Sequence, residues 1–147
     1  AKAFDPKHAH RYRAWISDEQ SEPATTFEHG EMFAATPYVL RNGVQVAASF
    51  EALVEHGPER GITLTDTLET LLEWRVWTHT THAGKALPDD HHCAQWTSTA
   101  FNLSARVGLN SVAPGSPDLQ AWTDERWWTR YLEVDCNSAM RLYCFEN

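Results

Sequence analysis

The sequence has no apolar run approaching the roughly 18 residues that a membrane-spanning helix requires, so we expect no membrane insertion. It also has no recognisable signal peptide. Because it opens at Ala1 rather than at methionine, we expect a chain that begins after a cleavage or inside a longer protein. Positive charge is scarce: 12 Lys and Arg residues against 20 Asp and Glu residues give a net charge of −8. Such a field repels polyanions and argues against nucleic acid as a partner.

The motifs of common enzyme classes are missing as well. The chain has no Gly-x-Ser-x-Gly segment, no His-Glu-x-x-His helix, no phosphate-binding loop and no dinucleotide fingerprint. Several carboxylates in the first part of the chain show no partner in the sequence, and we expect most of them to form a solvated face. They are Glu19, Glu22, Glu28 and Glu31. The sequence therefore indicates no catalytic residue.

Cysteine is also scarce, and Cys93, Cys136 and Cys144 lack the C-x-x-C spacing of zinc and thioredoxin-type sites. Two interpretations remain open. All three can be reduced, buried thiols, or two can form a disulfide while the third lacks a partner within the chain. We favour the second interpretation, because the second half of the chain is mostly loop and a covalent cross-link would stabilise it.

Aromatic residues, in contrast, are abundant: seven Trp, six Phe and four Tyr occur in 147 residues. Compact domains that are rich in irregular loops use such side chains to fill the space between segments. The length fits one domain, residues 1–147, with a single core.

Local patterns predict an α+β chain with short strands and one or two helices. Asn42-Gly43, between two apolar segments, predicts a type I′ hairpin over residues 37–47. Ser49 is a suitable N-cap for a short helix that Gly57 ends. The spacing of Leu64, Leu68, Leu71 and Leu72 is typical of a second helix. We expect strands at 12–17, 75–78 and 140–145 and loops at 84–92 and 108–118.

Five separated segments together resemble one known family. They are Tyr12 to Asp18, Pro37 to Ala47, Val76 to Thr78, Cys93 to Ser98, and Cys136 with Arg141 to Glu146. In this order, the segments resemble the endostatin-like domain of bacterial secreted and outer-membrane lipoproteins, a relative of the C-type lectins. The resemblance covers nearly the whole chain and implies a C-type-lectin-like fold with long, disulfide-clipped loops.

The resemblance also implies a role for each cysteine. By the family pattern Cys93 pairs with Cys136, and Cys144 is the outer half-cystine whose partner lies upstream of Ala1. The domain would then lack its N-terminal strand and part of its first helix, so that Cys144 is free or joined to another segment or a second chain. The leucine-rich stretch from Thr65 to Trp74 departs from the family, which usually has a Gly-containing polar loop there.

The segment from His79 to Cys93 is rich in residue types that bind metals. Imidazole and carboxylate ligands suit zinc, copper or nickel, whereas an ordinary solvated loop is the competing interpretation. The candidate ligands are His79, His82, Asp89, Asp90, His91 and His92. A lectin-type calcium site is not expected, since Leu87 and Thr123 replace two of its oxygen ligands.

An exposed aromatic residue beside arginines is a candidate surface for stacking on a sugar or a protein. Trp127 and Trp128 are adjacent, so one of them faces outward if the segment is extended, whereas both are buried if it coils. The candidate ligand-binding residues are Arg126, Trp127, Trp128 and Arg130.

These observations support three functional hypotheses. The first is a secreted, non-catalytic recognition module that binds a glycan or a cell-surface or extracellular protein. The second is a metal-dependent secreted hydrolase, in which an ion in the His79–His92 loop polarises a bound water. The third is the structural remainder of a longer processed protein from an oxidising extracellular compartment.

Overall fold

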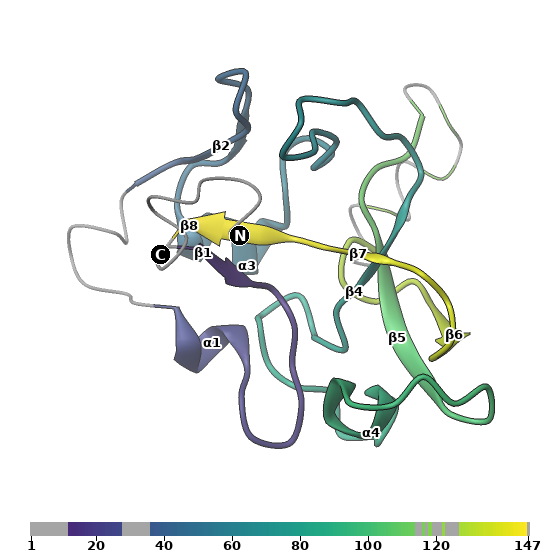
Figure 1. The fold of residues 1–147 in the computed structure, drawn as a ribbon. Coiled ribbons are helices and arrows are strands. Elements are labelled where there is room, and N and C mark those ends of the chain that lie inside the picture. Colours follow the sequence, from purple (N-terminus) through teal and green to yellow (C-terminus); the bar gives the residue numbers. More distant parts are fainter. Residues whose placement is uncertain are drawn as a thin grey trace.

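The structure, a computed structural model, describes residues 12–27, 36–113, 116, 118, 122 and 127–146. It is an α+β fold with short helices and mostly antiparallel strands (Figure 1). Strands β4 (Arg75–Trp77), β5 (Ser104–Leu109), β6 (Leu132–Asp135) and β7 (Arg141–Leu142) form a four-stranded sheet in the order β6-β5-β4-β7. Only the β4–β7 pair in this sheet is parallel.

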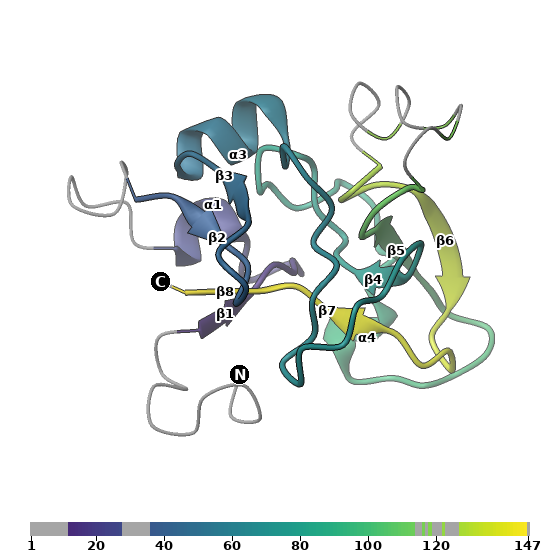
Figure 2. The ribbon, with the colours of Figure 1, turned by 90° about the horizontal axis from the view of Figure 1, so that it is seen from above.

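Two smaller sheets complete the described strands. Strand β1 (Tyr12–Ala14) pairs with β8 (Cys144–Glu146), and β2 (Tyr38–Val39) pairs with β3 (Gln45–Ala47), both antiparallel. In Figure 2 the β1–β8 pair and the β2–β3 hairpin lie on one side of the molecule and the four-stranded sheet lies on the other. The predicted C-terminal strand is divided between the two sides, since β7 belongs to one sheet and β8 to another.

Three short helices are described: α1 (Pro23–Thr26), α3 (Phe50–His56) and α4 (Cys93–Trp96). The predicted capping of α3 is confirmed. The Ser49 side chain accepts a hydrogen bond of 3.1 Å from the Ala52 backbone N–H, and Gly57 ends the helix with a φ of 78°. The apolar residues Phe50 and Leu53 face the core, as the helical spacing requires.

The predicted hairpin around Asn42-Gly43 is also confirmed, but its turn type is wrong. A type I′ turn requires positive φ at both central residues, and here only Gly43 has one, at 83°. Gly43 N donates to Leu40 O over 2.8 Å, and Leu40 N donates to Val44 O over 2.8 Å. This is the pattern of a three-residue loop with a glycine bulge.

The helix predicted over Leu64–Leu72 is wrong. Residues Leu64 and Thr70 form an antiparallel bridge instead. Leu68 has a φ of 66°, which a right-handed helix does not allow. Both Leu68 and Leu72 are exposed. The stretch therefore carries helical spacing but folds as an irregular hairpin, and the loop predicted at 108–118 likewise begins inside β5.

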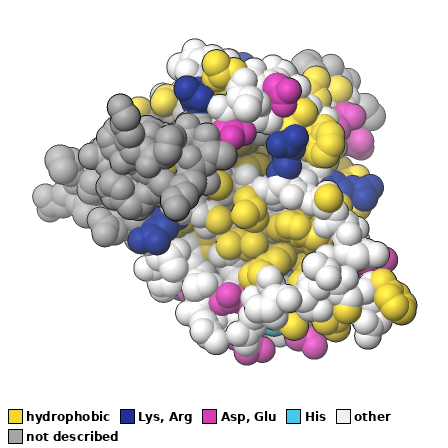
Figure 3. Space-filling view, in the orientation of Figure 1, with side chains coloured by type: hydrophobic (Ala, Val, Ile, Leu, Met, Phe, Trp, Pro, Cys, Tyr) yellow, Lys and Arg dark blue, Asp and Glu magenta, His cyan; other side chains and the backbone are white. Residues whose placement is uncertain are grey.

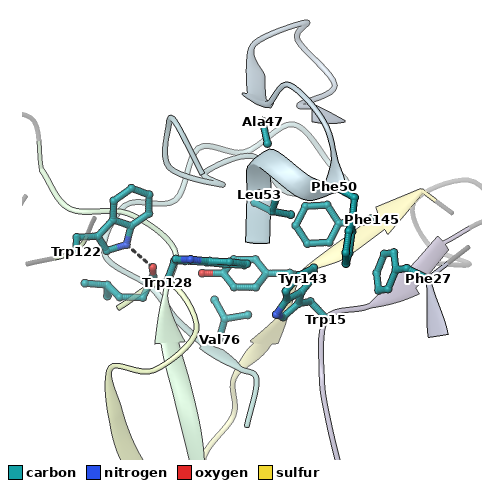
Figure 4. Close-up of a cluster of buried hydrophobic side chains, with 11 residues drawn as sticks. Trp15, Phe27, Ala47, Phe50, Leu53, Val76, Trp122, Trp128, Tyr143 and Phe145 are labelled. Carbon is teal, nitrogen blue, oxygen red and sulfur yellow. Dashed lines mark hydrogen bonds between the residues drawn. The ribbon is translucent and has the colours of Figure 1, made fainter. Parts of the chain in front are cut away.

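The core is mainly aromatic and joins the two sides of the molecule. Trp15 is fully buried and its ring lies 5.0 Å from that of Trp128 and 5.7 Å from that of Phe27. Figure 4 shows Trp15 between Phe27 on one side and Tyr143 and Trp128 on the other. The aromatic load noted in the sequence thus fills the space between elements that are too short to form a continuous layer.

A second, smaller cluster surrounds the disulfide bond. Cys93 and Cys136 are bonded, which confirms the predicted pair, and the bond spans 43 positions of sequence. Trp77 and Trp96 pack against it with ring centroids 5.7 Å apart. Cys144 is a free, exposed cysteine. The disulfide therefore ties α4 to the residue that follows β6.

Candidate functional site

A polar cavity of about 320 Å³ lies between the segment around α1 and the loop that follows β4. We call it the histidine cavity, because two of its residues are buried histidines. Its lining is Asp18, Glu19, Gln20, Ser21, Glu22, Thr25, His79, Ala86, Leu87, Asp89 and His92. The two walls are joined by Ala24 N, which donates to Gly84 O over 2.9 Å, and by Ser17 N, which donates to Thr78 O over 3.0 Å.

His79 contributes a buried ring nitrogen to this cavity. The side chain is 1% exposed, and its Nδ1 has no hydrogen-bond partner within the described part of the chain. Nδ1 lies 3.7 Å from Oδ1 of Asp89. A hydrogen bond to the His91 backbone engages the ring, and because Nδ1 is unpartnered we assign this bond to Nε2–H. Nδ1 of the neutral ring is therefore a bare acceptor.

The pKa of His79 is lowered from its usual 6.5, chiefly because burial penalises the charged ring. Asp89 and the hydrogen bond to the His91 backbone oppose this shift, whereas the rings of His92 and His91 add to it. The imidazole is therefore neutral at neutral pH, although it lies beside a carboxylate.

His92 has the same tautomer but presents its other ring nitrogen to the cavity. Its Nδ1 accepts a hydrogen bond of 2.9 Å from the Gln95 backbone N–H, so the proton of the neutral ring must be on Nε2. This Nε2 is buried and lacks a partner among the residues described, and Glu19 Oε1 is 3.7 Å away. The His79 and His92 rings meet edge to face, with centroids 5.2 Å apart. One histidine offers the cavity an acceptor, and the other offers a donor.

Two carboxylates on the α1 side are fixed by the backbone. Asp18 Oδ1 accepts from the backbone N–H groups of Gln20 (2.8 Å) and Ser21 (2.9 Å). Burial alone would raise the pKa of Asp18, but these hydrogen bonds outweigh it and lower the pKa. Glu22 accepts from Ala86 N (2.8 Å) and from Lys85 Nζ (3.0 Å), which likewise lower its pKa. Both side chains are thus ionised at neutral pH.

Asp89 joins the cavity to a charged network behind it. Burial would raise its pKa, but the His91 backbone N–H and the guanidinium of Arg106, 3.3 Å away, lower it. Arg106 also contacts Glu133 Oε1 at 2.8 Å. His91 Nδ1 lies 3.4 Å from both Asp89 Oδ1 and Glu133 Oε1. Asp89 is therefore held ionised with one oxygen facing His79.

Strained backbone flanks the cavity on the side of the histidines. His79 has a φ of 50°, and all four residues of α4 have φ between 50° and 62°. Left-handed conformations of residues other than glycine cost roughly 1–2 kcal/mol each, and they cluster at functional sites. The turn is held by the Cys93–Cys136 disulfide and by Trp96 Nε1, which donates to Ser17 O over 2.8 Å.

The structure brings together four of the six predicted metal ligands: His79, Asp89, His91 and His92. Asp90 is exposed and, like His82, does not line the cavity. Among the described residues, no group of three or more His, Cys, Asp or Glu side chains is placed to hold a metal ion. Zinc sites use at least three protein ligands. Four of the predicted ligands therefore lie close together, but they do not form a coordination shell for a metal ion.

Burial removes one residue, Trp128, from the predicted ligand-stacking surface. Trp128 is fully buried in the core, so its proposed role as a surface anchor is wrong. Trp127 is half-buried and packs against Tyr131 in a tilted arrangement, with ring centroids 5.0 Å apart. Arg130 is exposed, and Arg126 lies outside the described residues. Among the described members of the predicted set, Trp127 and Arg130 remain available at the surface.

Hydrophobic side chains also gather near the centre of one face, as Figure 3 shows. The exposed large hydrophobic residues include Leu68, Leu72, Trp74 and Leu142. The guanidinium of Arg141 lies over the Trp74 ring, 5.3 Å from its centroid. These side chains offer apolar contact area, but they show no unpartnered polar group that would select a ligand.

Sequence reasoning missed the α1 side of the cavity. Glu19 and Glu22 belong to the carboxylates of which most were expected to be solvated, yet both line the cavity together with Asp18. The Asp18-x-x-Ser21 spacing, typical of a side chain that caps a turn, was the one local signal. Glu19 is placed by Gln95 Nε2, which donates to it over 2.9 Å from 76 positions away.

Comparison with known proteins finds no matching family model and no curated protein of significant sequence similarity. None of the helices in the described part of the chain is long and apolar enough to cross a membrane. The Cys93–Cys136 disulfide is consistent with an oxidising compartment. The function is therefore inferred from the geometry of the site.

Proposed function

We propose that the chain is a secreted, non-catalytic recognition module whose ligand enters the histidine cavity. The observation that carries this proposal is the pair of buried imidazole nitrogens, His79 Nδ1 and His92 Nε2, which line a concave surface without a partner in the described chain. A buried polar group without a hydrogen bond costs about 1–3 kcal/mol. A bound ligand that pairs with one or both of these nitrogens would reduce this cost.

The surrounding scaffold supports binding rather than flexible catalysis. The cavity is made of loops, which commonly carry recognition, but its walls are fixed by a disulfide and by the hydrogen bond from Trp96 to Ser17. Preformed pockets with a few placed polar groups are typical of ligand sites. We also propose the endostatin-like, C-type-lectin-like assignment, in which such loops project from a rigid α+β core.

A blocking substitution tests the proposal. Thr25 lines the cavity at its exposed rim, and its neighbour Thr26 is exposed on the same helix but does not line it. The wild-type protein is screened against a glycan array and against a set of peptides from extracellular proteins, with and without chelator. We expect at least one ligand that Thr25→Trp weakens by about tenfold or more and that Thr26→Trp and chelator leave unchanged.

Equal loss of binding in the two variants, or none in either, would place the ligand elsewhere and overturn the proposal. Circular dichroism of both variants shows whether the fold is retained, so that loss of binding is not confused with unfolding.

A further inference from the structure

We infer that the histidine cavity binds a primary ammonium group carried on a slender chain. This inference rests on the proposed function, since it names the ligand class of the same site. The group can belong to a free alkylamine or to a lysine side chain of a partner protein, because both present the same charge and the same three donors.

The first argument is charge. Four carboxylates line the cavity, and no Lys or Arg side chain is among the lining residues. Lys85 and Arg106 offset Glu22 and Asp89 from outside the cavity. Asp18 and Glu19 have no such cation in the described structure, and their closest partners are neutral amides and a hydroxyl. The cavity therefore keeps an excess of negative charge, which favours a cation.

The second argument is the pattern of acceptors. With the His79 proton on Nε2, His79 Nδ1 and Asp89 Oδ1 are both acceptors, they lie 3.7 Å apart, and neither can donate to the other. A donor placed between them satisfies both. An ammonium group has three donors and no acceptor, so it can bond both groups and still face Glu19.

His92 has a supporting role in this arrangement. Its Nε2–H is a donor and would repel a cation, but the nearest acceptor is Oε1 of Glu19 at 3.7 Å. Glu19 is mostly exposed and can move toward this donor. His92 is therefore a positioning residue that orients Glu19, whereas His79 and Asp89 contact the ligand.

Two other ligand classes fit less well. A zinc ion needs at least three protein ligands, which the described residues do not offer, and His92 Nε2 already carries a proton. A neutral sugar is usually held partly by an aromatic face, and no Trp, Tyr or Phe is among the lining residues. Ala86 and Leu87 instead give the cavity an aliphatic wall, suited to a methylene chain.

The test uses n-butylammonium as the probe and n-butanol as its uncharged analogue. Binding of each is measured by NMR, from the chemical shifts of the histidine ring signals. At neutral pH we expect saturable shifts of the His79 and His92 signals with the ammonium, at a Kd on the order of 1 mM. Butanol should not shift them. Because the attraction is electrostatic, added salt should weaken the binding.

Matched variants identify the contacts. Asp89→Asn and Glu19→Gln should each weaken butylammonium about tenfold, as loss of a charged hydrogen bond does. Glu55→Gln makes the same change in net charge at an exposed position of α3, outside the cavity, and should leave the affinity unchanged. A lysine peptide that binds more tightly than butylammonium supports a protein partner, and the reverse supports a free amine.

The failure of this inference is separable from that of the proposed function. If methyl glucoside or Zn²⁺ shifts the His79 signal while butylammonium does not, the cavity is a binding site but the ammonium assignment is wrong. If butylammonium binds equally to wild type, Asp89→Asn and Glu19→Gln, its contacts lie outside the cavity and the inference is also overturned.

Discussion

The indole N–H of Trp96 donates a 2.8 Å hydrogen bond to the backbone carbonyl of Ser17, 79 positions earlier in the chain. Trp96 ends the left-handed turn that begins directly after His92, and Ser17 directly precedes Asp18. This bond is therefore one of the contacts that hold the two walls of the histidine cavity together. The ring also packs edge to face on Trp77 beside the disulfide.

Replacing Trp96 by Phe should loosen the cavity without emptying the small core around the disulfide. The ring remains, but the hydrogen bond to Ser17 O is lost, at a cost of about 1 kcal/mol in the free energy of unfolding. We expect weaker butylammonium binding as the walls separate. The control is Trp77→Phe, which shrinks the partner ring without removing this bond. Calorimetry of both variants would contradict the idea if Trp77→Phe weakened binding more.

The disulfide should account for much of the stability of the second half of the chain. Its loop of 43 positions corresponds to a loss of about 2–4 kcal/mol when Cys93 and Cys136 are both replaced by Ala. Cys144→Ser should change the free energy of unfolding by less than about 0.5 kcal/mol, because Cys144 is free and exposed. Urea unfolding measures both, and comparable losses in the two proteins would be evidence against this account.

Gly108 should tolerate no side chain. A Cβ built there overlaps the backbone carbonyl of Trp128, and backbone cannot move aside as a flexible side chain can. We expect Gly108→Ala to destabilise by about 1–3 kcal/mol or to prevent folding. Gly43→Ala has open space but a φ of 83°, so it should cost only about 1 kcal/mol. Thermal melts that rank the two in the opposite order would disprove this.

Stability should fall as the pH drops below about 6.5, and His79 should be one cause. Its pKa is lowered in the folded state from 6.5, so the unfolded chain takes up the proton first and gains free energy. The contribution is complete above pH 6.5 and is lost progressively on acidification. Asp18 and Asp89, whose pKa values are lowered from 3.8, lose their contributions only at lower pH.

Comparing urea midpoints of wild type and His79→Gln between about pH 7.5 and 5 checks this prediction. The variant should be less stable overall but less sensitive to pH in that window. An unchanged slope would show that the pH dependence does not arise from His79.

Local chemistry explains what the sequence predicted well. The turn at Gly43 and the cap at Ser49 act within a few residues, so both the hairpin and α3 follow from short segments. The leucines from 64 to 72 gave a wrong prediction because the structure of this stretch is not set by local sequence. Their spacing fits a helix, but the stretch instead forms the Leu64–Thr70 bridge and a positive φ at Leu68. Periodicity alone does not reveal such tertiary constraints.

The residues of the candidate site likewise fall into two groups, those that local sequence predicts and those that only long-range contacts bring to the cavity. The histidines and Asp89 share one loop, and composition was enough to select that loop. Glu19 reaches the cavity through contacts made 73 to 76 positions away, with His92 and Gln95. The burial of Trp128 depends on its contact with Trp15, and adjacent tryptophans alone do not decide which one faces inward. Such contacts arise only from the completed fold.

Strands β7 and β8 have a consequence for the synthesis of the protein. The four-stranded sheet needs β7 to complete its edge, and β1 has its described partner only in β8. A chain still on the ribosome lacks both strands until residues 141–146 have emerged. We therefore expect folding to begin after translation of this region, with Trp15 and its aromatic neighbours accessible to chaperones until then.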